Sequence, residues 1–152
     1  MLYPKKMVAA FTWFIFLLVT NNFAIANTEA PVFDTRSLQI SGEAYLLEIA
    51  KTRRQRQHGL MFRHYLGPRQ GMVFVYPDSG NHRIWMKNTK IPLTVIWVTE
   101  AGQVINIRKL MPCRHDPCQS YGADHPAKYI IELNDKPHTI KIGDSISGLN
   151  HL

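Results

Sequence analysis

The stretch that decides the fold is GMVFVYPDSGNHRIWMKNTKIPL, from Gly71 to Leu93. It contains an apolar run, a Pro-Asp-Ser-Gly turn, a second apolar run, and the polar cluster Lys87-Asn88-Thr89. Two apolar runs around such a turn predict a β-hairpin with strands over 71–76 and 84–86. The cation, amide and hydroxyl of the cluster need hydrogen-bond partners, so the cluster either ties off a buried strand or presents a site.

Alternating and β-branched runs on both sides of this stretch predict further strands. They are expected as a pair of strands around a Ser41-Gly42 turn in 38–50, and over 93–99, 104–110, 127–133 and 139–142. A short helix is expected after Thr52, which is a good N-cap, and Gly59 is placed to stop it. The pattern therefore predicts a mainly β domain, either a single-domain β sandwich or a jelly-roll-like, partly closed barrel, with one short helix.

Residues 1–26 have the pattern of a secretory signal peptide. Lys5 and Lys6 precede an apolar segment over 7–20, and Ala24-Ile25-Ala26 supplies a small-x-small cleavage pattern. A retained membrane anchor is the alternative, but the apolar segment is short for a full span. The other expected boundaries are a leader at 27–37, the β domain at 38–147 and a tail at 148–152. We therefore predict an exported domain, periplasmic or secreted, without stable membrane insertion after cleavage.

The chain is basic, with 18 Lys and Arg against 11 Asp and Glu. Much of the excess lies between Glu48 and Asp78, where the sequence has no carboxylate. Such a patch attracts acidic polymers, anionic membranes or nucleic acid, although a solvated face is the commoner outcome. The predicted export argues against nucleic acid as the natural partner.

Cys113 and Cys118 enclose the four residues Arg-His-Asp-Pro. In an oxidising compartment this spacing predicts a disulfide that pins a loop. The spacing differs from the two-residue spacing of thioredoxin-type redox sites, which argues against catalytic exchange. Zinc ligation together with His115 and His125 is one alternative, and two free thiols are the other.

The order of several short motifs resembles one known family. These motifs are Arg56, GLMFR at 59–63, Leu66, GMVF at 71–74, WMKNT at 85–89, IPL at 91–93, Gly102, Pro112, Cys118, Tyr121, the strand at 127–132 and Gly143-Asp144. Their order resembles the bacterial and archaeal family known as domain of unknown function 192, over about residues 38–146. The resemblance implies a compact β sandwich or jelly-roll-like domain, and it brings no accepted activity with it.

The polar cluster predicts a binding cleft. An aromatic platform followed by directed donors is one way in which β domains bind sugars and other small polar ligands. The expected ligand is polar and anionic or saccharide-like, with no cofactor and no metal. The predicted site residues are Arg63, Trp85, Lys87, Asn88, Thr89, Tyr121 and Glu132. The structural alternative for the cluster is a tied-off strand ending. For Glu132 the default expectation is a structural ion pair with Arg63 or Lys87.

Two other classes of function compete with a binding or accessory module. An enzyme of unassigned reaction, hydrolysis being one, would use Glu132 or Asp116 as its acid or base. A periplasmic copper-handling protein would use thioethers and imidazoles, the soft ligands that select Cu(I). Its candidate ligands are the dispersed histidines and Met61, Met72, Met86 and Met111. Methionine is far more often adaptable core filler.

We expect the mature protein to begin at Asn27, because Ala24-Ile25-Ala26 is the cleavage pattern. Mass spectrometry of protein isolated from a cell-envelope fraction identifies the N-terminal peptide. An intact form that begins at Met1 and stays embedded in the membrane would contradict this prediction.

Overall fold

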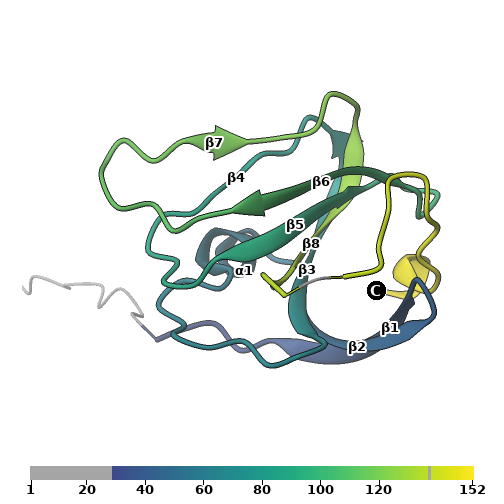
Figure 1. Ribbon diagram of the computed structural model, residues 1–152, viewed down its shortest axis with the longest axis horizontal. Coiled ribbons are helices and arrows are strands. Elements are labelled where there is room, and N and C mark those ends of the chain that lie inside the picture. The colour runs from purple at the N-terminus through teal and green to yellow at the C-terminus, as the bar shows by residue number, and fades with distance from the viewer. Residues whose placement is uncertain (1–28, 137) are drawn as a thin grey trace, which may run out of the picture.

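A computed structural model describes residues 29–136 and 138–152 of the chain (Figure 1). The predicted signal peptide and the first residues of the predicted leader lie outside this range. Within it, the chain forms a six-stranded mixed sheet in the order β1-β2-β3-β8-β5-β6 and a two-stranded sheet of β4 and β7. The prediction of a mainly β domain with one short α-helix is confirmed, and the large sheet ends at β1 and β6 without closing into a barrel.

The helices and strands of the described residues run from Asp34 to His151. Their bounds are β1 Asp34–Ile40, β2 Glu43–Ala50, α1 Arg53–His58, β3 Gln70–Gly80, β4 Ile84–Trp85, β5 Leu93–Val98, β6 Val104–Leu110, β7 Ser120–Tyr121, β8 Ala127–Asn134 and a 3-10 turn Leu149–His151. None of the helices in the described part of the chain is long and apolar enough to cross a membrane.

The first half of the domain is a hairpin followed by a crossover. Strands β1 and β2 pair antiparallel around Ser41 and Gly42, whose φ angles of 47° and 81° suit a tight two-residue turn. Strands β2 and β3 are parallel, so the chain must cross back between them, and it does so through α1. Thr52 and Gln55 form a capping box at the start of this helix, and Gly59 is its C-cap, as expected.

The large sheet is buried on both faces. One face carries a core that includes Leu47, Val73 and Ile131, and the C-terminal segment covers it with Ile140, Ile146 and Leu149. Two isolated bridges attach this segment, yellow in Figure 1, to Ile40 on β1 and to Gln103 before β6. The second face carries another core, which includes Phe74, Trp97 and Ile130. This second face holds the candidate site.

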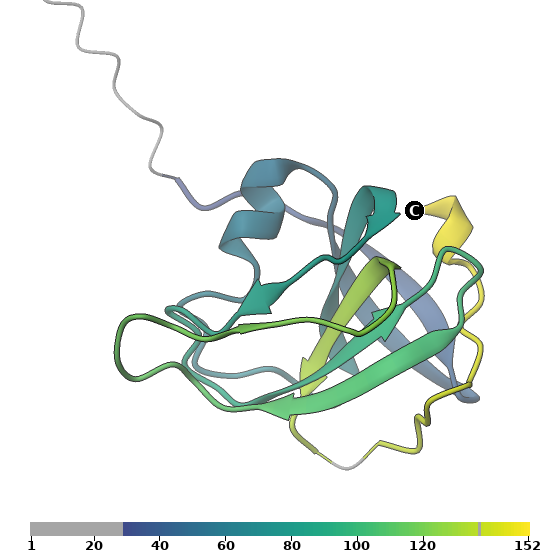
Figure 2. The ribbon, with the colours of Figure 1, turned by 90° about the horizontal axis from the view of Figure 1, so that it is seen from above.

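The second core is covered by the crossover and by the small sheet. Leu60 and Leu66 of the loop after α1 are buried in it, and so is Ile84 of β4. Figure 2 shows α1 lying beside β4 above this face. Helix α1 itself has no buried residue. Its role is therefore to present polar side chains over the second core.

The predicted hairpin of 71–76 with 84–86 is wrong. Strand β3 runs on to Gly80, with a register shift between Val75 and Gly80, and it pairs with β2 on one side and β8 on the other. Because both edges of β3 are occupied, β4 has no place beside it. Strand β4 pairs instead with β7, through Ile84 opposite Tyr121 and Trp85 opposite Ser120.

Two further boundaries differ from expectation. Strand β1 begins at Asp34, so residues 34–37 belong to the sheet and not to the leader. Residues 139–142 form no strand, although the side chain of Ile140 is buried as a strand pattern would suggest. Here the chain follows the core face as an irregular segment, because among the described residues its ladder contacts are the isolated bridges farther on, at Ser145 and Ile146.

The disulfide between Cys113 and Cys118 is present, with their Cα atoms 5.7 Å apart. It closes the loop between β6 and β7. The backbone N–H of Cys113 donates to the carbonyl of Met86, 3.2 Å away, which attaches this loop to the segment after β4. The predicted cysteine pairing is therefore confirmed.

We expect Gly71→Ala to lower the free energy of unfolding by about 1–3 kcal/mol, as overpacking does. A Cβ atom at this position would lie 2.3 Å from the backbone oxygen of Glu132 and 2.7 Å from a methyl carbon of Leu133. Relief would require moving paired strands apart. Urea unfolding followed by tryptophan fluorescence measures the loss.

Gly80→Ala in the same strand is the matched control, because its Cβ would only touch the His82 ring at 3.4 Å. An equal loss in both variants would show that backbone crowding at Gly71 is not the cause.

Candidate functional site

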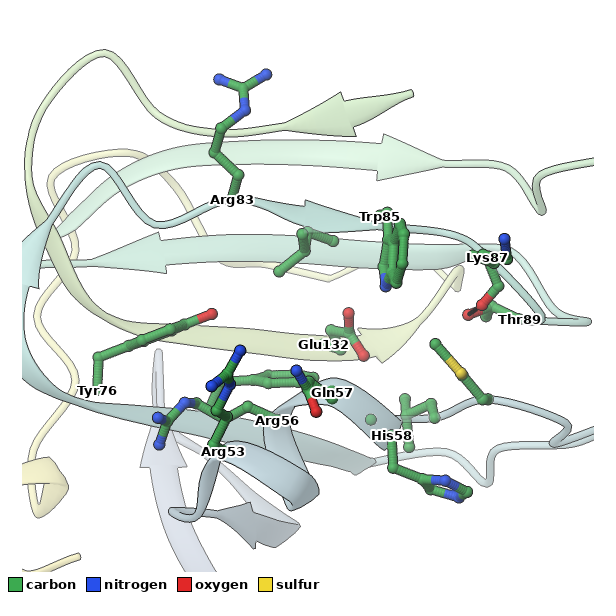
Figure 3. Close-up of a pocket in the computed structure, with 15 residues that line it drawn as sticks. Arg53, Arg56, Gln57, His58, Tyr76, Arg83, Trp85, Lys87, Thr89 and Glu132 are labelled. Atoms are coloured by element: carbon green, nitrogen blue, oxygen red, sulfur yellow. Dashed lines mark hydrogen bonds between the residues drawn. The ribbon is translucent and has the colours of Figure 1, made fainter. Parts of the chain in front are cut away.

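A pocket with a volume of about 390 Å³ opens on the second face of the sheet, between α1, β3, β4 and β8 (Figure 3). We call it the main pocket. Its apolar wall includes Leu60, Met61, Phe74, Ile84 and Trp85. Four cationic side chains line it: Arg53 and Arg56 from α1, Arg83 before β4 and Lys87 after β4. Glu132 is the only carboxyl among the described residues that line it.

Glu132 lies in the middle of β8, between Met72 of β3 and Val95 of β5. These two neighbours are completely buried, and Glu132 is only 4% exposed. Its carboxyl makes no hydrogen bond or ion pair with any described residue. Yet no side-chain nitrogen or oxygen of the described residues is both fully buried and unpaired, so the carboxyl oxygens reach the pocket surface. Figure 3 shows the carboxyl pointing between Trp85 on one side and Arg56 and Gln57 on the other.

Burial raises the pKa of Glu132 to about 8, because loss of water disfavours the charged carboxylate. The side chain is therefore mostly protonated at neutral pH. A protonated carboxyl donates one hydrogen bond and accepts others. The floor of the main pocket thus offers an uncharged donor and acceptor that the protein itself leaves unused.

Trp85 and Lys87 form one edge of the pocket. The Trp85 side chain is 48% exposed although its neighbours Ile84 and Met86 are buried. The alternation of a short strand explains this, because it turns residues 84 and 86 inward and residues 85 and 87 outward. The Lys87 ammonium lies 5.7 Å from the centroid of the Trp85 ring and 3.3 Å from Oδ2 of Asp116.

Tyr76 and Arg56 form the opposite edge. The Arg56 guanidinium lies 5.0 Å from the centroid of the Tyr76 ring and donates to the carbonyls of Lys51 and Val75. The other side of the tyrosine is held by His82, whose ring stacks on it at 3.7 Å. Burial raises the pKa of Tyr76 to about 12, so its hydroxyl stays protonated and available as a donor. These contacts hold Arg56 and Tyr76 in place before any ligand arrives.

The two other arginines of the pocket differ in how they are held. Arg83 donates to the hydroxyl and carbonyl oxygens of Ser120, at 3.0 and 2.6 Å. The side chain of Arg53 is exposed and makes no hydrogen bond or ion pair with a described residue. Arg53 is therefore the cation of the main pocket most free to meet an anion.

Four of the seven predicted site residues meet in the main pocket: Trp85, Lys87, Thr89 and Glu132. Arg63 does not line it, because both of its terminal nitrogens donate to Glu48 at 2.6 Å. The carbonyl of Asn88 accepts from the N–H of Phe62 at 2.8 Å, which ties two loops together. Tyr121 pairs with Ile84, and its hydroxyl donates to Gln119. These three residues support the walls of the site.

The predicted ion pair of Glu132 with Arg63 or Lys87 is wrong. Each cation has another carboxylate within reach, Glu48 for Arg63 and Asp116 for Lys87. Those partners lie nearer the surface, where an ion pair keeps part of its hydration. The carboxyl of Glu132 therefore faces the main pocket without a cationic partner among the described residues.

The main pocket also holds polar side chains that were not predicted from the sequence, among them Arg53, Arg56, Tyr76 and Arg83. A signal for two of them was present. Arg53 and Arg56 are three residues apart in a capped helix, so they lie on one face of it. Only the crossover from β2 to β3, however, places that helix over the second core.

The ligands of the copper alternative and the second carboxyl of the enzyme alternative, Asp116, do not meet at one point among the described residues. Asp116 belongs to the disulfide-closed loop and does not line the main pocket. Met72 and Met86 are core side chains, Met61 lines the pocket, and Met111 is 62% exposed, so the four methionines occupy different environments. The described residues contain no group of three or more His, Cys, Asp or Glu that could hold a metal ion.

Comparison with known proteins gives a family and two structural relatives. The sequence model of the family described as uncharacterised ACR, domain of unknown function 192, matches residues 36–148. A protein from Sinorhizobium meliloti described as a proposed transcription regulator is 26% identical, with a TM-score of 0.67 over 77% of this chain and 94% of its own. A protein of unknown function from Novosphingobium aromaticivorans is 28% identical, with a TM-score of 0.65 over 76% of this chain and 85% of its own. No curated protein matches the chain.

We expect Glu132→Gln to stabilise the fold increasingly as the pH rises from about 5 to about 8. In this window the unfolded chain loses the Glu132 proton near its ordinary pKa of 4.5, whereas the folded chain keeps it until about pH 8. The wild-type free energy of unfolding therefore falls, through this group, by ~1.4 kcal/mol per pH unit, and the glutamine variant avoids that loss. Urea unfolding of both proteins at several pH values measures the difference.

Glu100→Gln is the control. A hydrogen bond from Lys128 lowers the pKa of the Glu100 carboxyl, so this side chain is ionised in both states across the same window. Wild type and Glu132→Gln curves that stay parallel from about pH 5 to about 8 would contradict the assignment of a buried, unpaired carboxyl.

Proposed function

Because the chain belongs to the family described as domain of unknown function 192, which carries no activity in its description, we propose its function from the site itself: it is a binding module for a small, anionic, saccharide-like ligand. The ligand occupies the main pocket. Its hydroxyl groups meet Glu132, its ring stacks on Trp85, and its negative charge meets the arginines.

The observation that carries this proposal is the unpaired carboxyl of Glu132. A buried polar group without a partner costs free energy, so it is usually found satisfied or at a functional site. Glu132 is 4% exposed, and the space beside it is the main pocket. A protonated carboxyl and a sugar hydroxyl are both donor and acceptor, so each satisfies the other without a buried charge.

The charge of the pocket favours an anion. Four cationic side chains line it, and its single carboxyl is mostly neutral at pH 7. Positive charge gathered in a cleft attracts anions and raises their local concentration. Arg53 can also bind a carboxylate or phosphate through two parallel hydrogen bonds, because its guanidinium has no other described partner.

Trp85 supplies the apolar part of the recognition. Its ring is about half exposed at the mouth of the pocket, where solvent normally disfavours a large apolar surface. A flat aromatic ring beside directed donors suits the apolar face of a sugar ring. Lys87 and Thr89 lie at the same edge of the pocket.

We also propose that the protein acts outside the cytoplasm. The sequence of residues 1–26 has the signal-peptide pattern, and the Cys113–Cys118 disulfide supports an oxidising compartment. Hydrolysis by a pair of carboxyl groups is not supported, because Glu132 is alone among the described lining residues of the main pocket.

We expect D-galacturonate to raise the melting temperature and to bind more tightly than galactose, which has the same ring without the carboxylate. A ligand that binds only the folded state stabilises it by mass action. Arg53→Ala should weaken galacturonate binding by about tenfold and leave galactose unchanged, since one charge-assisted hydrogen bond contributes about 1.5 kcal/mol or more. Trp85→Ala should weaken the binding of both sugars. Calorimetric titration of the wild type and of both variants with each sugar measures all six affinities.

Arg36→Ala is the control for net charge, because Arg36 is exposed on β1 and does not line the main pocket. A loss of galacturonate affinity in Arg36→Ala as large as that in Arg53→Ala would reduce the effect to general charge. Binding of neither sugar by the wild-type protein would refute a saccharide site.

A further inference from the structure

We propose that the ligand is an oligomer, a short chain of acidic sugars, which extends from the main pocket across Lys87 into a second pocket formed by the disulfide-closed loop. This inference rests on the proposed function, because its first sugar is the one in the main pocket. It adds a second binding subsite and the chemical class of the natural ligand, an acidic glycan rather than a free monosaccharide.

The second pocket has a volume of about 210 Å³ and lies against the loop between β6 and β7. We call it the loop pocket. Three cationic side chains line it, Lys87, Lys90 and Arg114, and its one carboxylate is Asp116. The side chains of Lys90 and Arg114 are exposed and make no hydrogen bond or ion pair with the described residues. The loop pocket thus presents unpaired positive charge.

The two pockets share Lys87 as a common wall. The Lys87 ammonium lies 5.7 Å from the centre of the Trp85 ring, in the main pocket, and 3.3 Å from Asp116, in the loop pocket. A sugar stacked on Trp85 therefore lies beside the entrance to the second subsite. A linear chain needs only to pass this one side chain to reach it.

The loop pocket is built before any ligand arrives. The disulfide closes the loop, and Cys113 N–H donates to the carbonyl of Met86 at 3.2 Å. The N–H of Thr89 donates to the same carbonyl at 3.3 Å. One backbone oxygen thus holds the end of the Trp85–Thr89 segment and the start of the cysteine loop together. A preorganised site loses less entropy when it binds a chain.

The charges favour a repeated anion over a single one. The pair between Lys87 and Asp116 is exposed, with 39% and 67% of the two side chains accessible, so it contributes little stability. An anionic sugar in the loop pocket can take the place of Asp116 beside Lys87 and also meet Lys90 and Arg114. An acidic group on each sugar matches cations in both pockets.

The test compares D-galacturonate with its linear tetramer by calorimetric titration of the mature protein. We expect the tetramer to bind about tenfold more tightly or better, because its second unit binds from high effective concentration. The double variant Lys90→Ala/Arg114→Ala should bind the tetramer with the affinity of the monomer and keep monomer binding unchanged. A neutral tetrasaccharide, cellotetraose, should show no gain from length.

The control variant Arg36→Ala/Lys141→Ala removes two exposed cations that line neither pocket. It should keep the full gain from the tetramer, and an equal loss in both double variants would overturn the second subsite in favour of general charge. A tetramer no tighter than the monomer overturns it as well and leaves the proposed function standing. Tighter binding of a single-stranded thymidine tetranucleotide would overturn the glycan class. Binding of neither monomer nor tetramer would overturn both proposals.

Discussion

Burial of strand β8 on both faces is the constraint on which the rest of the structure depends. The strand is hydrogen-bonded to β3 and β5, and its side chains enter both cores. The buried positions of such a strand are normally apolar, or polar with a hydrogen-bond partner, as Asn134 is. Glu132 breaks that rule, and its carboxyl has no partner among the described residues. The fold tolerates this because the main pocket opens directly beside Glu132 and the carboxyl oxygens reach its surface. Proteins commonly accept such local costs at functional sites.

Strand β4 and the residues that follow it form the accessible edge of the pocket above Glu132. Strand alternation sends Ile84 and Met86 into the second core and leaves Trp85 and Lys87 outside. The buried side chain of Met86 anchors the segment, and its carbonyl accepts bonds from Thr89 and Cys113. The apolar positions therefore fix where the polar ones lie. The buried neighbours hold Trp85 and Lys87 in place, and both side chains line the main pocket.

Local patterns predicted much of this fold. Period-2 alternation separates Ile130 from Ile131 whatever the strand pairs with, and the two side chains do lie in different cores. The capping box of α1, the Ser41-Gly42 turn and the Cys113–Cys118 disulfide also follow from short-range geometry. Each depends on residues within a few positions of one another, so each is written in the sequence directly.

The sequence by itself showed polar residues next to an aromatic one in an otherwise apolar stretch. This pattern identified four residues of the main pocket: Trp85, Lys87, Thr89 and Glu132. Only the tertiary structure decided their partners. Strand β4 does not pair with β3, because β2 and β8 occupy both edges of β3. Arg63 pairs with Glu48, 15 positions earlier in the chain. Helix α1 instead places Arg53 and Arg56 in the pocket that Glu132 lines. Which charged groups become neighbours depends on residues far apart in the chain. The crossover between the parallel strands β2 and β3 decides which of them lie close together.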